Sequence, residues 1–174
     1  MKKEQKTDFI FATLLMLTGV GLIVCPLFNF TNIKLIFSIV MGIYALANLG
    51  LFIINYKSKD FEGLLTFFAS IAAGVCNYIY YDGKYPVILS LSVILWIMMM
   101  SIVKLNKADY YNDKKDRMWK LMVFLLIMFL IIGLVTAISL SNNDVTTTIV
   151  LGYFFFIHGL FEMIDPLVKY LIKS

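Results

Sequence analysis

The sequence has little charge and an excess of apolar residues. Asp, Glu, Lys and Arg together make up 15% of its 174 residues, and hydrophobic residues make up 61%. A soluble globular protein is nearer about one quarter charged and about one half apolar. A single soluble domain of this length could not hide so much apolar surface from water. The composition therefore excludes an ordinary cytosolic enzyme and a disordered chain, and it indicates an integral membrane protein.

Cysteine and histidine are also scarce. The two cysteines, Cys25 and Cys76, lie in apolar segments without a CxxC pair, and His158 is the one histidine. This set excludes a disulfide scaffold and cannot supply the four ligands of a structural zinc site. The P-loop, GxSxG, HExxH and GxGxxG patterns of common enzyme sites are absent too. We therefore predict no enzyme activity, no catalytic residues, no metal and no cofactor.

Six apolar segments are long enough, or nearly so, to cross a bilayer as helices, which takes about 20 residues. In lipid the backbone must satisfy its own hydrogen bonds, so each segment is a helix or a strand of a closed barrel. Barrel strands alternate apolar and polar residues, and runs such as 121–134 do not. We predict an all-α, polytopic integral membrane protein with a single membrane domain over residues 1–174. The predicted spans are residues 9–28, 33–54, 61–81, 86–103, 118–140 and 145–168.

Basic residues are distributed unevenly among the breaks between these spans. Thirteen of the fifteen Lys and Arg residues lie in the N-terminal segment, the second and fourth connections and the C-terminal segment, and the other two are Lys34 and Lys84. Cytoplasmic loops carry the excess of basic residues in membrane proteins. Both termini are therefore predicted to be cytoplasmic. The same excess favours contact with the anionic lipids of that leaflet over binding to nucleic acid.

The fourth connection, residues 104–120, is the most basic of the breaks. It holds six basic and three acidic residues. We expect it to form a cytoplasmic loop that lies on the inner leaflet. Tyr110 and Tyr111 are its predicted anchors, because tyrosine rings favour the boundary between apolar lipid and headgroups.

The spans are predicted to form three helical hairpins, residues 9–54, 61–104 and 118–168, because the outer connections are short and the inner ones are longer or more charged. A weak internal repeat supports this division. GLIVC at 21–25 aligns with AAGVC at 72–76, and GIYALAN at 42–48 aligns with GYFFFIH at 152–158. Such spacing suits a repeat unit of one hairpin.

Residues 17–26 (LTGVGLIVCP) and 42–46 (GIYAL) resemble the HdeD-like family of bacterial acid-resistance membrane proteins, and residues 131–134 (IIGL) and 152–162 echo the pattern. The likeness covers nearly the whole chain in length, hairpin count and glycine placement. The second hairpin departs from it, since residues 93–100 contain no glycine. The resemblance implies a protein of the bacterial inner membrane that is linked to acid stress and has no enzymatic site.

Three ionisable residues share one face of the sixth span. His158, Glu162 and Asp165 follow i, i+4, i+7 spacing. Charged groups inside a bilayer are costly, so they pair, stay neutral or face water. Asn48, at the position of the repeat equivalent to His158, is a predicted polar partner. We expect Asp165 to be solvated near the end of the helix, because the residue before a proline avoids helical geometry.

Three interpretations of this cluster remain open. His158 and Glu162 form a structural buried pair in the first. In the second the pair responds to protons, because histidine changes charge between about pH 5 and 8. In the third the cluster lies on a ligand or ion pathway. Lys169, one turn after Asp165, is a possible ion-pair partner for that carboxylate.

Small residues at helical spacing predict places where helices approach closely. Such residues matter in membranes because lipid supplies no hydrophobic drive for helix association. They pack helices within one chain or form the seam of a homo-oligomer. The predicted positions are Ala69 with Ala73, Ser70 with Gly74, and Gly152 with Gly159.

The sequence therefore favours a small non-enzymatic inner-membrane protein that acts in acid or envelope stress. One alternative is the substrate-binding subunit of a vitamin-uptake transporter, although the small residues lie on the third span rather than on the first. Another is a small channel or proton pathway, for which the polar residues Asn48, Asn77, His158 and Glu162 are few. No soluble ligand follows from the sequence.

Overall fold

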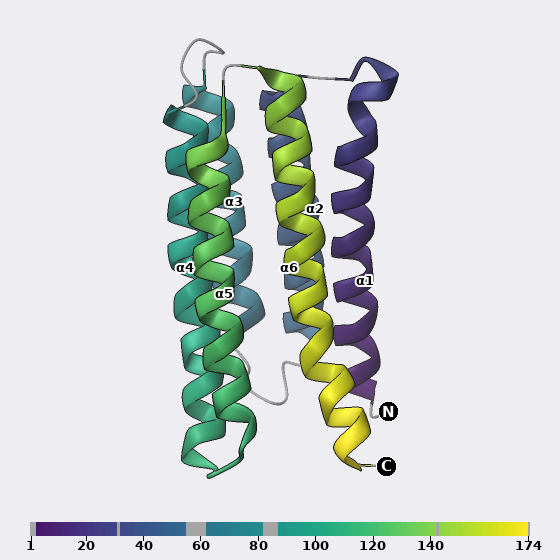
Figure 1. The fold of residues 1–174 in the computed structure, drawn as a ribbon, viewed down its shortest axis with the longest axis vertical. Helices are drawn as coiled ribbons and strands as arrows, with labels where there is room; N and C mark the ends of the chain where they lie inside the picture. Colours follow the sequence, from purple (N-terminus) through teal and green to yellow (C-terminus); the bar gives the residue numbers. More distant parts are fainter. Residues whose placement is uncertain (1–2, 31, 55–61, 82–86, 142, 174) are drawn as a thin grey trace.

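A computed structural model describes residues 3–30, 32–54, 62–81, 87–141 and 143–173 (Figure 1). Within these ranges the chain forms six α-helices and one short 3-10 helix, without a strand. Phe61 and Pro86, where the third and fourth spans were predicted to begin, lie outside the described residues, as do Lys57, Lys59 and Lys84. The helices are α1 (Lys3–Val24), η1 (Cys25–Phe28), α2 (Ile33–Ile54), α3 (Glu62–Tyr80), α4 (Val87–Asp113), α5 (Met118–Ser139) and α6 (Asp144–Lys173).

All six α-helices are long and apolar enough to cross a membrane. They run along one common direction as a bundle, and the two chain termini lie at the same end of it (Figure 1). The all-α class and the six helices predicted from hydropathy are thus confirmed for the described residues. The bounds of α2 match the prediction. Helix α3 begins one residue later and ends one residue earlier than predicted, and α5 ends one residue earlier.

The fourth helix is longer than the sequence predicted. It continues past Val103 to Asp113, so the expected loop over residues 104–120 is wrong for most of its length. The chain reverses only around residues 114–117, where Lys115 adopts a left-handed φ of 54°. The helix persists because Ala108 and Tyr111 are buried against the start of α5. Tyr111 is therefore a packing residue, whereas Tyr110 is exposed.

The most extensive packing does not follow the predicted hairpins. Helix α1 packs mainly on α6, α2 on α3, and α4 on α5, whereas α1 and α2 barely touch. The closest pairs are therefore α1 with α6, the first and last helices, and the helices on either side of the second and fourth connections, α2 with α3 and α4 with α5. The three-hairpin repeat is not confirmed as the unit of packing.

Glycines let α1 and α6 approach each other closely. A Cβ atom added at Gly152 would lie 2.9 Å from the carbonyl oxygen of Gly19 and 2.7 Å from the Ile23 side chain. One added at Gly159 would lie 2.7 Å from the backbone nitrogen of Met16. The glycine pair predicted on the sixth span is thus a contact within the chain. Gly74 lets α2 and α3 approach in the same way, since an added Cβ would lie 3.0 Å from Cβ of Met41. The Gly74 carbonyl also accepts a hydrogen bond of 3.1 Å from the Ser38 hydroxyl.

We predict opposite effects of two Gly→Ala substitutions on stability. Gly152→Ala forces α1 and α6 apart, and overpacking of this kind costs about 1–3 kcal/mol, so the melting temperature in detergent should fall by roughly 3–10 °C. Gly21→Ala is the matched control, because nothing lies within 4 Å of its added Cβ. Alanine favours helix over glycine, so this control should melt at the same temperature or higher. Equal losses in the two variants would contradict close α1–α6 packing.

Candidate functional site

His158 lies at the centre of the bundle inside a cage of aromatic rings. Its side chain is fully buried. The ring centroid lies 4.9 Å from that of Phe129 on α5, 5.7 Å from Trp96 on α4, 6.2 Å from Phe154 on α6 and 6.3 Å from Tyr44 on α2. These rings exclude water from the imidazole. Its protonation state therefore depends on the few polar groups that reach it.

The two nitrogens of His158 face different partners. Nε2 lies 3.4 Å from the hydroxyl oxygen of Tyr44. Nδ1 makes no hydrogen bond, and it lies 3.9 Å from Oε1 of Glu162 one turn further along α6. This arrangement suits a neutral imidazole that carries its proton on Nδ1, toward the carboxylate, and accepts a hydrogen bond from the tyrosine at Nε2. The predicted i, i+4 juxtaposition of His158 and Glu162 is therefore present.

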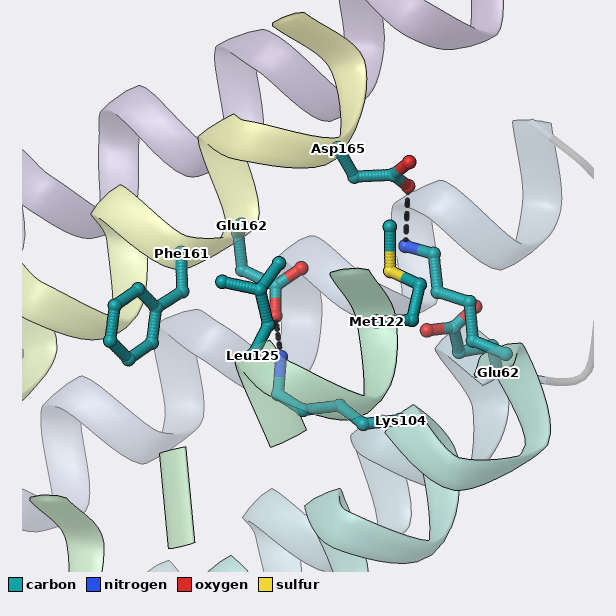
Figure 2. A pocket seen from close by; sticks show the side chains of 8 residues that line it. Glu62, Lys104, Met122, Leu125, Phe161, Glu162 and Asp165 are labelled. Carbon is teal, nitrogen blue, oxygen red and sulfur yellow. Dashed lines mark hydrogen bonds and ion pairs between the residues drawn. The ribbon is translucent and has the colours of Figure 1, made fainter. Parts of the chain in front are cut away.

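Glu162 is bound by a lysine that the sequence analysis placed in a loop. The Lys104 ammonium contacts Oε1 of Glu162 directly, and it also lies 5.0 Å from the centroid of the Phe129 ring. One turn along both helices, Nζ of Lys107 lies 3.0 Å from Oδ2 of Asp165. Helices α4 and α6 run in the same direction in the bundle (Figure 1), so the two i, i+3 pairs match in register. Figure 2 shows both ion pairs as dashed lines.

Asp165 differs from its predicted state in two ways. Its side chain is buried rather than solvated, because Lys107 reaches it across the bundle. Helix α6 also does not end there; it continues through Pro166 to Lys173. Proline removes one backbone hydrogen bond within a helix, and α6 changes direction in this region (Figure 1). Packing thus overrides the local preference of an Asp-Pro step.

Asn48 lies in the same region but does not bind His158. Its Nδ2 donates a hydrogen bond of 2.8 Å to the carbonyl oxygen of Tyr44, within α2. Tyr44, one turn earlier, is the residue of α2 that meets the imidazole. Tyr44 was not among the predicted site residues, because tyrosines in such sequences are typical interfacial anchors. Its position in the middle of a predicted span was the signal that could have identified it.

A recess opens beside the two ion pairs, toward the end of the bundle where the termini lie. Four helices line it: α3 contributes Glu62, and the other lining residues are Lys104, Lys107, Met122, Leu125, Phe161, Glu162 and Asp165. Figure 2 shows how these side chains surround it. Glu62 also interacts electrostatically with Lys107. Three carboxylates and two ammonium groups therefore meet here, and the recess reaches Glu162, next to His158.

The spacing of the charges could have revealed both lysines. Lys104 and Lys107 are one turn apart, as are Glu162 and Asp165. Two oppositely charged i, i+3 pairs on neighbouring parallel helices can form two bridges at once. That inference required knowing that the fourth helix continues past residue 103 and lies near the sixth. Hydropathy does not contain this information.

Comparisons with protein-family models, with curated proteins and with solved structures found no match to this chain. They leave the resemblance to the HdeD-like family as a prediction from the sequence. In the described part of the chain, no group of three or more His, Cys, Asp and Glu side chains has the geometry of a metal site. The functional argument therefore depends on the His158 cage and on the ion pairs beside it.

Proposed function

We propose that this chain is a small, non-enzymatic, multi-pass protein of the bacterial inner membrane that acts in acid or envelope stress, with both termini in the cytoplasm. The apolar faces of the helices support membrane insertion, because large hydrophobic side chains are exposed along every α-helix. The excess of basic residues in the N-terminal segment and in the fourth connection supports the orientation. The HdeD-like residues support the role in stress.

One observation carries the proposed mechanism: a buried histidine lies between a tyrosine hydroxyl and a carboxylate that a lysine already binds. In acid, His158 takes up a proton and its Nε2 becomes a donor. The Tyr44 hydroxyl must then turn to accept, and the Glu162 carboxylate is drawn from Lys104 toward Nδ1. Lys107 and Asp165 lie one turn beyond. Protonation thereby shifts the packing of α2, α4 and α6 or the oligomeric state.

We predict that cross-linking of the protein in membranes differs between neutral and strongly acidic pH in the wild type. His158→Ala and Glu162→Gln should each remove this difference and reduce survival of the bacterium in acid. Ser92→Ala serves as the control, since Ser92 is equally buried on α4 and, within the described ranges, its hydroxyl bonds only the carbonyl of Ile88 in its own helix. Wild-type behaviour of both variants would refute the proton-responsive pair.

A proton pathway is the second candidate function, and the recess that reaches Glu162 favours it. A proton-flux measurement on the purified protein in liposomes distinguishes a proton pathway from a pH-responsive switch. Proton flux that Glu162→Gln abolishes would indicate a pathway, whereas pH-dependent cross-linking without flux would indicate a responsive switch.

A further inference from the structure

The helices form two packed units that differ in how they are held together. Helices α1 and α6 form one unit through the glycine contacts at Gly19, Gly152 and Gly159. Helices α2 to α5 form the other, since α2 packs on α3, α3 on α4 and α4 on α5. Between the units, α5 and α6 share moderate contact, and α6 barely touches α2. The backbones of the two units therefore approach each other less than the helices inside either unit do, and it is mainly side chains that join the units, in the core around Trp96.

Side chains alone join α4 to α6. In the described residues, no Cα atom of α4 lies within 8 Å of one in α6. Two long lysine side chains cross the intervening space and end at Glu162 and Asp165. The recess lies in this space. At this end the ion pairs therefore join α4 to α6, whereas further along the helices Trp96 on α4 packs against Phe154, Phe155 and His158 on α6.

The opposite end of α6 is tied by short-range bonds. The Thr147 hydroxyl donates to the carbonyl of Ser141 at 2.9 Å and accepts from its backbone nitrogen at 3.2 Å. These bonds fix the first turn of α6 to the connection that follows α5. These bonds would keep any relative movement of the two units small there and leave it largest at the end with the ion pairs.

We propose that Lys104–Glu162 and Lys107–Asp165 form a latch between the α1–α6 unit and the α2–α5 unit, and that its release opens the recess to water as far as Glu162 and His158. Lysine suits this role. Its long stem keeps contact with apolar surface while a released ammonium reaches toward solvent. A partly buried ion pair also adds little net stability, so its open and closed states stay close in free energy. The latch does not depend on the proposed role in stress or on acid as its trigger.

Cysteine accessibility at neutral pH tests the latch without reference to acid. The full-length protein, with Cys25 and Cys76 replaced by serine, receives Met122→Cys in the wall of the recess. A membrane-impermeant maleimide then modifies the protein in proteoliposomes. Lys104→Met removes the charge and keeps the length of the stem, and it should accelerate modification about tenfold. The charge exchange Lys104→Glu with Glu162→Lys should restore the slow rate.

The matched control is Leu126→Cys, one turn further along α5, which is similarly buried but does not line the recess. Its rate should not change with Lys104→Met. Acceleration at both positions would indicate general loosening and would overturn the latch, as would equal rates at Met122→Cys with and without Lys104.

Distances between spin labels provide a second test. Labels at the exposed positions Leu105 on α4 and Leu167 on α6 report the separation of the two units. Labels at Ile10 and Leu160, also exposed, report the distance within the α1–α6 unit. Lys104→Met should shift the first distance to longer values and leave the second unchanged. If both distances shift, or if neither does, the two-unit movement is wrong.

Discussion

Trp96→Ala should lower the melting temperature in detergent by roughly 10 °C, because removal of a large buried aromatic side chain costs about 3–5 kcal/mol. Trp96 is one of the most buried side chains of the bundle. Its ring makes edge or tilted contacts with Tyr44, Phe129, Phe154 and Phe155, at centroid distances of 5.5 to 6.2 Å. The loss arises from these packing contacts.

The indole nitrogen adds a polar contribution to the same site. It donates a hydrogen bond of 3.0 Å to the Ser70 hydroxyl, which in turn donates to the carbonyl of Thr66. Trp96→Phe keeps an aromatic ring but removes the donor and part of the ring volume, so we expect a smaller loss, of about 1–2 kcal/mol. Trp119→Ala is the matched control, because Trp119 is only partly buried near the start of α5. Thermal unfolding of the three variants measures the differences. Equal losses for Trp96→Ala and Trp119→Ala would contradict the central role of Trp96.

Glu162→Leu should destabilise the protein by roughly 2–3 kcal/mol, whereas the double variant with Lys104→Met should recover most of that loss. The single substitution leaves the Lys104 ammonium beside Phe129 without its carboxylate. Placing a charge without a partner in an apolar environment is costly. The double variant replaces both charges by apolar groups of similar length, and such replacements are often nearly neutral.

A double-mutant cycle measures this coupling. The free energies of unfolding of the wild type, Lys104→Met, Glu162→Leu and the double variant are compared in the same detergent. Lys114→Met is the control, since Lys114 is exposed in the turn directly after α4 and contacts Tyr110 rather than a carboxylate. It should change stability little. Additive losses in the cycle would show that Lys104 and Glu162 do not interact, and would also remove the basis for the latch.

The number and bounds of the spans could be read from the sequence because hydropathy is a local property. Each helix must satisfy its own backbone hydrogen bonds and show apolar side chains to its surroundings. The segment 33–54 therefore coincides with α2 to the residue. His158 and Glu162 could be found in the same way, since their i, i+4 spacing brings them together on any helix.

The end of α4 shows where local information is insufficient. Lys104 and Lys107 are the first charges after an apolar run, and the sequence analysis accordingly ended the span before them. They remain helical because carboxylates on α6 lie opposite and because Ala108 and Tyr111 are buried against α5. Each carboxylate lies 58 residues along the chain from its lysine, so no local pattern contains the pairing.

The sequence by itself determined that this protein is a set of six apolar helices and that one of them carries an internal histidine and two carboxylates. Only the tertiary structure decided which helices pack together, that Tyr44 rather than Asn48 meets the histidine, and that two lysines of α4 neutralise the carboxylates of α6. The physical reason is the range of the interactions. Helix formation and side-chain spacing depend on neighbours within a few residues, whereas ion pairing and helix packing depend on groups that only the folded chain brings close.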